Sequence, residues 1–514
     1  MLLARSRMIS DIDRYCAEEL SMPLHLLMGR AGAAVARLIR ESVPTGSTVT
    51  ILAGKGNNGG DGYSAACLLM DDYSVAVVDV FSMGQRTEEG RFYLNKYLSN
   101  GGRVEKFEEM DDICKLISDS DCIVDAIFGT GFAGRMPDPL RRLSDSINLA
   151  TRAFKVAIDV PLGVNADDGS VAESGACAMS ATVALSFVKP GLLSFPAKAY
   201  VGRLVLDDLG IPRQEIADRF AFTDFYVDRD LARSLLPNRP ENSNKGSFGK
   251  LLCIVGSEQY RGAAHLALEG ALRGGVGLVG FLGVRELVGE LSAKFPEVIY
   301  HPVDTVADMT DSDIGEAVAL QNKYNAVLIG SGSGTSSGLL RLLCATLTTD
   351  GPTVILDADA INALSSLGND ATVMIKNSPR TVLLTPHPLE FSRLTGNDVS
   401  MVQLHRIEDA SKFAAETGAL LLLKGAATVC TDGGTVYINS TGSSALSKAG
   451  SGDVLAGFVG AMTASGVRPL SALAICAYFH GYAADSLSQE LSLFGVTPSD
   501  LPREICRAIA DVYR

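Results

Sequence analysis

Short runs of aliphatic and β-branched residues alternate along the chain with longer segments whose apolar positions recur at helical spacing. Strands that alternate with helices in this way predict βαβ units and a parallel sheet. In the first part of the chain, the pattern predicts helices over much of 11–40 and over 62–70 and 139–150, and strands over 48–53, 74–81, 122–126, 154–159 and 181–187.

A second series of the same kind begins at residue 250. It predicts helices over 452–464 and 471–487, and strands over 250–256, 277–282, 326–329, 353–357, 381–385 and 419–424. Between the two series, the segments 210–212 and 236–246 contain proline and glycine and indicate a change of domain. We therefore predict two α/β domains, a Rossmann-like three-layer αβα domain over 1–225 and a second over 226–514.

Composition narrows the class of protein. A chain of 514 residues with 47% hydrophobic and 20% charged residues can form a full core in each domain, which excludes a disordered chain. A net charge of −14 argues against a general nucleic-acid-binding protein. Ten cysteines without a CxxC pair indicate reduced thiols, and no apolar run is long enough to span a membrane. We expect a cytoplasmic homo-oligomer with no nucleic-acid or membrane partner.

The first glycine-rich segment, GKGNNGGDG (54–62), directly follows the first predicted strand. Its glycines would let main-chain amides approach an anion, and a helix expected to begin near Tyr63 would add partial positive charge. The first six residues satisfy GxGxxG, and Asp79 follows about 20 residues later, as in a dinucleotide-binding fingerprint. A tight strand-to-helix turn explains a single match of this kind equally well.

Polar side chains gather at these strand ends: Asn57, Asn58 and Asp61 in the first glycine segment, then Asp125, then Asp159, with a second glycine segment at 129–135. The ends of parallel strands lie along one edge of a sheet, where ligands bind. Two carboxylates and an amide there could hold a hard cation and leave one carboxylate for proton transfer. Each aspartate could otherwise cap the helix that follows it.

The segments GNNGGDG (56–62), VDAIFGTGFAGR (124–135), AIDVPLGVNADDG (157–169) and SFVKPGL (186–192) resemble, in this order, the epimerase domain of NAD(P)H-hydrate repair proteins. The resemblance implies that Asp159 contacts the reacting ring as the acid/base group. It implies a potassium ion on Asn58, Asp125 and the main-chain carbonyl of Leu162, which stands where the family usually has serine. The implied substrate-binding residues are Asn57, Asn58, Gly59, Gly60, Asp61, Gly129, Thr130, Gly131, Phe132, Ala133, Gly134, Arg135 and Asp159.

The segment AGSGDVLAG (449–457) carries the strongest chemical signal. Gly450 and Gly452 open a predicted helix, so that successive amides would converge on one anion, with Asp453 in the first turn. A carboxylate beside such amides can act as a base or an acid toward a hydroxyl that is phosphorylated or lost. Asp453 could otherwise serve as a favourable charge at a helix N-terminus.

This segment resembles the anion hole of the ribokinase-like superfamily, and the segments 245–267, 328–336, 355–364, 383–394 and 421–433 resemble the dehydratase domain of the same repair proteins. The resemblance implies a ribokinase-like α/β domain with Ala263, Gly334, His387 and Asp453 on the hydrated nucleotide. It places the adenine nucleotide on Lys424, Gly425, Ala426, Ala427, Thr428, Ser443, Gly450, Ser451 and Gly452. Asp357 and Asp359 could bind magnesium or only cap helices.

Together the resemblances imply repair of hydrated NADH and NADPH. The first domain would epimerise the R and S forms of NADHX and NADPHX at C6 of the nicotinamide ring, with K⁺ bound. The second would dehydrate the S form with ADP and Mg²⁺, giving AMP and phosphate; the choice of ADP rests on the resemblance alone. Two alternatives remain, a ribokinase-like kinase for a small metabolite, and a first domain that binds nucleotides without catalysis.

Overall fold

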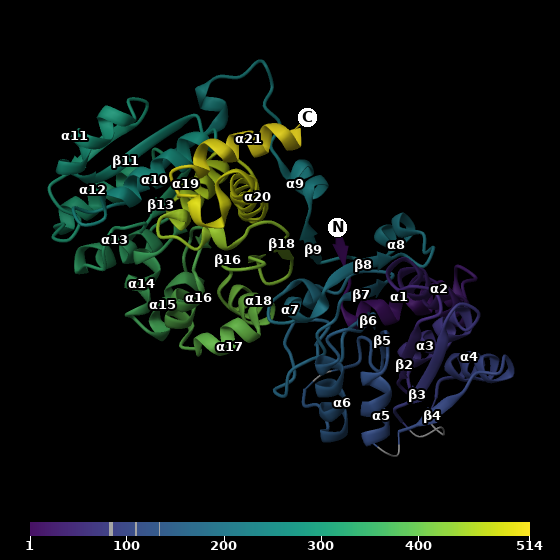
Figure 1. The fold of residues 1–514 in the computed structure, drawn as a ribbon. Coiled ribbons are helices and arrows are strands. Elements are labelled where there is room, and N and C mark those ends of the chain that lie inside the picture. The colour runs from purple at the N-terminus through teal and green to yellow at the C-terminus, as the bar shows by residue number, and fades with distance from the viewer. Residues whose placement is uncertain (82–85, 108–109, 133, 514) are drawn as a thin grey trace. The chain divides into compact units, whose positions relative to one another are not determined.

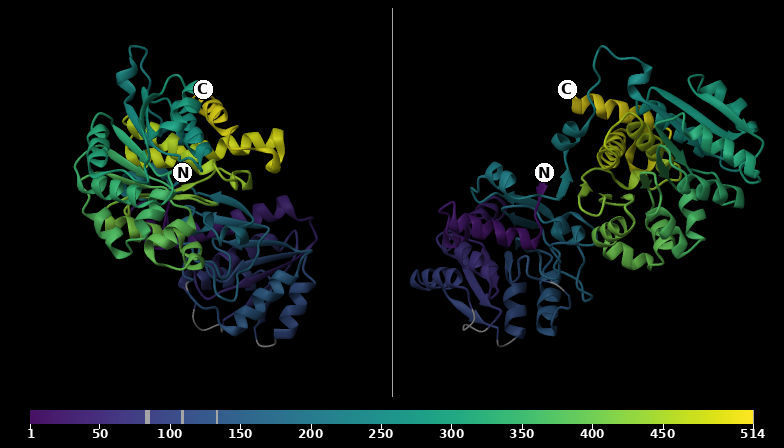
Figure 2. Two further views of the ribbon diagram at one scale, coloured as in Figure 1. Left: turned by 90° about the vertical axis from the view of Figure 1, so that its left-hand side faces the viewer. Right: turned by 180° about the vertical axis from the view of Figure 1, so that it is seen from behind.

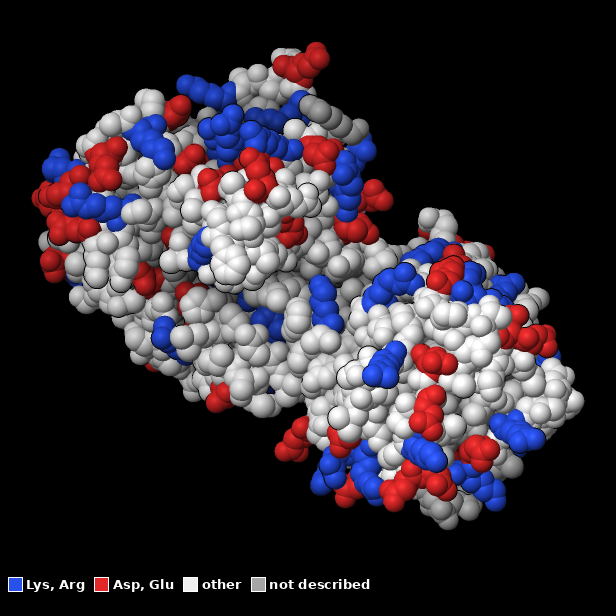
Figure 3. Space-filling model, viewed as in Figure 1, with Lys and Arg blue, Asp and Glu red and all other residues white. Residues whose placement is uncertain are grey.

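The computed structural model describes residues 1–81, 86–107, 110–132 and 134–513. These residues form two compact units, Leu2–Asp224 and Phe225–Arg514, and Met1 belongs with the second unit. Each unit is built on a sheet with helices packed against it, seen from three directions in Figures 1 and 2. On the face drawn in Figure 3, acidic and basic side chains are interspersed on each unit.

The first unit contains a parallel sheet in the order β4-β3-β2-β5-β6-β7-β8. The five strands predicted from the sequence are present with minor changes at their ends. The two edge strands β4 and β8 were not predicted, because β4 has only three residues and β8 begins and ends with a charged residue. The strands are β2 (Thr48–Ala53), β3 (Ser74–Asp79), β4 (Val104–Lys106), β5 (Cys122–Ala126), β6 (Phe154–Ile158), β7 (Ala181–Leu185) and β8 (Arg203–Asp207).

Helices cover both faces of this sheet. Alternate residues of β2 enter opposite cores, since Ile51 packs in one buried cluster and Leu52 in another. This is the three-layer αβα arrangement that was predicted. The helices are α1 (Ser6–Glu18), α2 (Leu24–Ser42), α3 (Asn57–Leu69), α4 (Glu88–Ser99), α5 (Met110–Ser118), α6 (Asp138–Leu149), α7 (Lys198–Val201) and α8 (Arg213–Arg219), with a 3-10 turn η1 (Pro190–Leu193).

Two helix predictions in this unit were wrong. The helix expected over 11–40 is two helices, because the chain turns through Ser21, whose φ is 53°, and Pro23. Helix α3 begins at Asn57 rather than near Tyr63, so the glycine-rich segment forms the first turns of the helix. A Cβ on Gly59 would lie 2.0 Å from the carbonyl oxygen of Gly54, so glycine here allows the helix to approach the end of β2.

The second unit contains a larger sheet in the order β9-β18-β17-β16-β15-β14-β13-β10-β11-β12. The strands from β10 to β16 are parallel, and β17 and β18 continue the sheet as antiparallel strands. The strands are β9 (Asp224–Val227), β10 (Lys250–Ile254), β11 (Leu278–Val284), β12 (Ile299–Val303), β13 (Ala326–Ile329), β14 (Thr353–Leu356), β15 (Val382–Leu384), β16 (Leu420–Leu423), β17 (Val429–Thr431) and β18 (Val436–Asn439), and β1 (Leu2–Leu3) is a two-residue strand near the N-terminus.

The helices of the second unit lie between its strands or after the last strand, β18. They are α9 (Arg229–Leu235), α10 (Arg261–Arg273), α11 (Arg285–Lys294), α12 (Asp311–Gln321), α13 (Ser337–Thr348), α14 (Asp359–Ser365), α15 (Asn369–Lys376), α16 (Pro388–Thr395), α17 (Val399–Leu404), α18 (Arg406–Thr417), α19 (Ser451–Ala464), α20 (Pro469–Gly495) and α21 (Leu501–Tyr513), with 3-10 turns η2 (Lys245–Phe248) and η3 (Ser444–Leu446). Within the described part of the chain, no helix combines the length and apolarity that a bilayer crossing requires.

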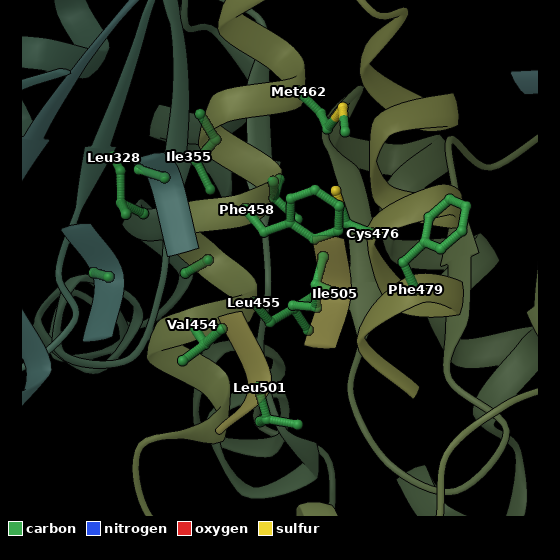
Figure 4. Packing of buried hydrophobic residues seen from close by; sticks show 14 of the residues in the cluster. Leu328, Ile355, Val454, Leu455, Phe458, Met462, Cys476, Phe479, Leu501 and Ile505 are labelled. Carbon is green, nitrogen blue, oxygen red and sulfur yellow. The ribbon is translucent and has the colours of Figure 1, made fainter. Parts of the chain in front are cut away.

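Helix α19 lies inside the core of the second unit. Figure 4 shows Val454, Leu455 and Phe458 packed between sheet residues and the helices α20 and α21. All three side chains are buried, with Phe458 fully so. Because the helix is held on several sides, the position of its first turn is fixed relative to the strand ends.

Candidate active sites

A cavity of about 430 Å³ opens where the strands of the first unit end. It is lined by the start of α3, the loop after β5, the end of β6, the segment after β7, and helices α1 and α2. Of the residues predicted for this site, those that line the cavity are Asn57, Asn58, Asp61, Gly129, Thr130, Gly131 and Asp159. Gly59, Gly60, Phe132, Gly134 and Arg135 do not line it in the described structure, and Ala133 lies outside the described residues.

Asp159 and Lys189 form a buried ion pair in this cavity. The Lys189 side chain is fully buried, and its ammonium also donates to the carbonyl oxygen of Leu185 at 2.9 Å. Asp159 has a φ of 67°, a backbone strain of about 1–3 kcal/mol that folded proteins retain mainly at functional positions. Our sequence analysis quoted the segment that contains Lys189 but missed this residue, because Asp159 and Lys189 meet only when β6 and β7 pair.

Two further carboxyls face the same pair. Burial raises the pKa of Asp13, on α1, to about 6; Lys189 opposes this shift, and Asp159 adds to it. Burial, with Asp159 and Asp13, raises the pKa of Asp61 well above its usual range. Asp13 was also missed, although an acidic residue four positions after the buried Ile9, on the apolar face of a helix, was a usable signal.

Of the residues predicted to hold potassium, Asp125 contacts Leu162, and Asn58 lies near Asp159. The Asp125 carboxylate is fully buried and accepts the main-chain N–H groups of Ile127 at 3.1 Å and Leu162 at 2.6 Å. Burial nevertheless raises its pKa to about 6. The side chains of Asn58 and Asp159 both lie against Gly129. A Cβ atom added to this glycine would lie 3.6 Å from Asn58 Oδ1 and 3.4 Å from Asp159 Oδ2.

Asn58 is unusual because its amide oxygen and nitrogen are both buried without a hydrogen-bond partner among the described residues. A buried amide without partners costs about 1–3 kcal/mol, so such a group indicates a ligand or ion. The main-chain carbonyl of Leu162 accepts the N–H of Cys177 at 2.9 Å and keeps one lone pair. The oxygens of Asn58, Asp125 and Leu162 are of the chemical type that hard cations prefer.

The dinucleotide-binding fingerprint fails at its acidic residue. Asp79 forms an ion pair with Arg86, and both side chains are 2% exposed. The Arg86 guanidinium also lies over the Tyr63 ring, 4.9 Å from its centroid. Because its carboxylate is buried and paired, Asp79 cannot bind a ribose hydroxyl as the fingerprint requires.

In the second unit, Asp453 lies in the first turn of α19 beside a cluster of charged groups. Burial, followed by the nearby Asp357 carboxylate, raises the pKa of Asp453 to about 7, and Lys424 opposes this shift. The Lys424 ammonium lies 2.9 Å from Asp357 Oδ1 and 3.9 Å from Glu390 Oε2. A Cβ on Gly452 would lie 3.3 Å from Lys424 Nζ, so this lysine reaches the N-terminus of α19.

Asp357 holds the neighbouring strand ends together. Its carboxylate accepts hydrogen bonds from Ser331 Oγ at 2.9 Å and Thr385 Oγ1 at 2.7 Å, in addition to Lys424. Asp359 accepts the main-chain N–H of Gly334 at 2.9 Å, which fixes the predicted substrate loop. Asp357 and Asp359 thus position the site, and Asp357 has little remaining capacity for a metal ion.

His387 caps helix α16. Its Nδ1 accepts the main-chain N–H groups of Leu389 and Glu390 at 3.2 Å, so this nitrogen carries no proton. Burial, then Lys424, lowers the pKa of His387. Its side chain is 45% exposed, and its Nε2 lies 3.2 Å from Glu390 Oε1, so both ring nitrogens have partners within α16.

The predicted nucleotide-binding residues fall on two loops. The loop after β16 contains Gly425, Ala426, Ala427 and Thr428, and Gly425 and Ala426 are exposed. The second contains Ser443, whose hydroxyl is buried without a partner in the described structure, and leads to Gly450 with a φ of 103°. Ser451 Oγ donates to the carbonyl oxygen of Leu446 at 2.7 Å, which closes the turn before α19.

Two structural features support these loops. Arg406, which is 1% exposed, donates to the carbonyl oxygens of Leu423 and Lys424, both at 3.0 Å. No local pattern in the sequence indicated this role. Ala263 lies on α10 against the glycine loop after β13, since a Cβ on Gly332 would lie 2.5 Å from Ala263 Cβ.

Two family models match the chain. One, described as YjeF-related protein N-terminus, matches residues 24–191, and the other, described as NAD(P)H-hydrate dehydratase, matches residues 251–507. The bifunctional NAD(P)H-hydrate repair enzyme Nnr of Moorella thermoacetica is 33% identical over 516 residues, which cover 98% of this chain and 95% of that protein. The protein of the same name from Escherichia coli is 30% identical over 497 residues, covering 95% and 90%.

A solved structure is also similar. The ADP/ATP-dependent NAD(P)H-hydrate dehydratase of Bacillus subtilis, co-crystallised with ATP and Mg²⁺, is 30% identical and covers 55% of this chain and 97% of its own, with a TM-score of 0.49. The two family models, in this order, and relatives that span nearly the whole chain confirm both resemblances found in the sequence. The chain belongs to the family of bifunctional NAD(P)H-hydrate repair enzymes, which epimerise hydrated NADH and NADPH and dehydrate the S epimer at the expense of ADP.

Proposed function

We propose that each unit carries out one of the two reactions. Epimerisation would occur in the cavity around Asp159, in a domain covering 1–225, and dehydration beside Asp453, in a domain covering 226–514. The observation that carries the first assignment is the buried Asp159–Lys189 pair in a cavity at the sheet edge. The second rests on the raised pKa of Asp453, which matches an acid/base group that works near neutral pH.

In the first site, Asp159 would exchange a proton with the oxygen at C6 of the substrate. The Lys189 ammonium pairs with this carboxylate and orients it at the end of β6. The predicted residues that line the cavity, Asn57, Asn58, Asp61, Gly129, Thr130 and Gly131, would surround the hydrated nucleotide. Exclusion of water by the buried walls would strengthen these electrostatic contacts.

A potassium ion would lie between Asn58, Asp125 and Leu162. The support for this site is the unpartnered amide of Asn58 and the buried Asp125 carboxylate, which accepts the main-chain N–H of Leu162. The ion would supply a fixed positive charge near the developing charge on the substrate oxygen. Replacing KCl by tetramethylammonium chloride at equal ionic strength should lower the epimerisation rate and leave dehydration of the S epimer unchanged.

In the second site, the amides at the start of α19 would bind the transferred phosphate. Lys424 lies at that point and would pair with a phosphate oxygen, while Gly425–Thr428 and Ser443 enclose the rest of the nucleotide. Asp453 would accept the proton of the substrate hydroxyl as it attacks the phosphate of ADP. Mg²⁺ would bind chiefly to phosphate oxygens and water, because the Asp357 carboxylate already has three donors.

The decisive experiment gives the full-length protein a mixture of R and S hydrates with ADP and follows the return of absorbance at the NADH maximum. We expect the wild-type protein to restore the whole mixture. In Asp159→Asn, only the S fraction should recover quickly, because epimerisation should fall by about 10²–10⁴-fold. In Asp453→Asn, neither fraction should recover at the wild-type rate, because dehydration should fall by the same factor. Asp145→Asn, on the exposed face of α6, is the matched control.

Three outcomes would contradict parts of the proposal. Full recovery by Asp159→Asn would make the first domain a nucleotide-binding module without catalysis. A stable phosphorylated alcohol, formed without recovery of the coenzyme, would favour a ribokinase-like kinase. Recovery with ATP but not with ADP would overturn the choice of phosphate donor. The expected homo-oligomeric state and cytoplasmic location stay predictions, tested by light scattering and cell fractionation.

A further inference from the structure

Epimerisation at C6 by loss and return of water needs proton transfer on both faces of the ring. The leaving hydroxyl must receive a proton on one face, and the water that enters on the other face must lose one. The Asp159–Lys189 pair forms a single rigid group at the end of β6. A second proton-transfer group from a different element of the same cavity would serve the other face.

Helix α1 provides an acidic residue at such a place. Asp13 lines the cavity together with Ile9 and Ser10, its neighbours on the same helical face. Its carboxylate is only partly buried, and no hydrogen bond to it is found among the described residues. A carboxyl that faces a cavity without a structural partner is free to bind a ligand.

The start of α1 is attached to the rest of the site. Ser6 Oγ donates to the carbonyl oxygen of Thr130 at 3.2 Å, and its main-chain N–H donates to Asp167 Oδ1 at 2.7 Å. Thr130 lies in the second glycine segment, and Asp167 lies in the same segment after β6 as Asp159. Asp13, about two helical turns further along α1, is therefore held in place relative to both loops.

The two carboxyls have different surroundings in the cavity. Asp159 forms the ion pair with the Lys189 ammonium. Asp13 forms no ion pair or hydrogen bond among the described residues; burial raises its pKa to about 6, Lys189 opposes this shift, and Asp159 adds to it. Two carboxyls that face one cavity from different environments are typical of an acid and a base acting on one substrate.

We propose that Asp13 is the second proton-transfer group of the epimerase, acting on the face of the nicotinamide ring opposite the Asp159–Lys189 pair. This inference rests on the proposed role of Asp159 in the same cavity. It adds a catalytic residue from α1, outside the glycine segments and strand ends that carry the other predicted contacts.

The reaction proceeds in two balanced steps. Protonated Asp13 gives its proton to the C6 hydroxyl, the C6–O bond breaks with its electron pair on oxygen, and water leaves. The lone pair of the ring nitrogen forms a double bond to C6, which gives a cation. A water molecule on the other face then bonds to C6, and its proton passes to the Asp159–Lys189 pair. The opposite epimer reacts by the same steps in reverse, and exchange with solvent restores both groups.

The test compares epimerisation with exchange of the C6 oxygen in oxygen-18 water, measured by mass spectrometry on each purified epimer without ADP. In Asp13→Asn, epimerisation should fall by at least about 100-fold above the spontaneous background. The epimer whose hydroxyl faces the Asp159–Lys189 pair should still exchange its oxygen, because water can leave and return on that face. The other epimer should lose exchange. Asp13→Glu, which retains a carboxyl, should recover part of the epimerisation.

Asp11→Asn is the matched control, because Asp11 lies on the same helix, is 42% exposed and pairs with Arg14. It should retain both activities. Epimerisation by Asp13→Asn within about threefold of wild type, or a parallel loss of exchange from both epimers, would overturn the proposal. If Asp13→Asn fails to fold by circular dichroism, Asp13→Glu decides, and a folded Glu variant with no epimerisation and no exchange would also overturn it. A wild-type protein that neither epimerises nor exchanges would instead refute the proposed role of the first domain.

Discussion

Replacing Asp453 by asparagine should stabilise the second unit while abolishing dehydration. The pKa of this carboxyl rises from 3.8 to about 7 because it is buried beside Asp357, with Asp359 and Glu390 adding repulsion. A group whose pKa is raised on folding destabilises the folded state wherever it is ionised, at pH above its unfolded value. Asparagine keeps the shape of the side chain and removes the charge.

The expected gain follows from that difference in pKa. At 1.36 kcal/mol for each tenfold change in the acid constant, 3.8 to about 7 corresponds to ~4 kcal/mol. Solvent reaches part of this side chain and screens its charge, so we expect ~2 kcal/mol of added stability above pH 8. The gain should shrink as the pH falls below 7 and vanish below about pH 4, where Asp453 is protonated in the unfolded chain as well as in the folded protein.

Calorimetry at pH 5 and pH 8.5 would measure this effect. The relevant transition is the one that ADP shifts to higher temperature, and in Asp453→Asn it should lie a few degrees higher at pH 8.5 and exceed that of the wild type by a smaller margin at pH 5. Asp304→Asn is a suitable control, because Asp304 is 89% exposed in a surface ion pair with Arg285. A variant that is equally or less stable than wild type at pH 8.5 would refute the argument that burial and like charges strain this site.

Three further predictions concern other parts of the two sites. Lys189→Met should lower epimerisation by at least about 100-fold and destabilise the first unit by about 3–5 kcal/mol, since it leaves the Asp159 carboxylate buried without its ion-pair partner. Urea denaturation followed by circular dichroism measures the loss of stability. Gly59→Ala should cost about 1–3 kcal/mol and reduce epimerisation but not dehydration, because the new Cβ would lie 2.0 Å from the Gly54 oxygen. Arg406→Met should raise the KM for the nucleotide more than it lowers kcat, because Arg406 holds the main chain before the Gly425 loop; an unchanged KM would contradict this role.

Long apolar runs predicted the central strands of both sheets, because a strand buried on both faces contains little else. Thr48–Ala53 and Ala326–Ile329 were predicted to the residue. The strands that were missed are short or lie toward the edges, such as Val104–Lys106 and Val429–Thr431, where few buried positions mark them. The start of α3 was missed because glycines disfavour a helix locally, and only its packing against β2 explains them.

The sequence by itself determined the order of the central strands, the two glycine-rich segments, and the aspartates that end parallel strands, since each follows from local spacing. Which charges meet was decided by the tertiary structure alone. Lys189 reaches Asp159 through the pairing of β6 with β7, Asp13 joins them from α1, and Lys424 connects Asp357 with the start of α19. Ion pairing and acidity depend on distance and on exclusion of water, and both arise only when distant segments pack together.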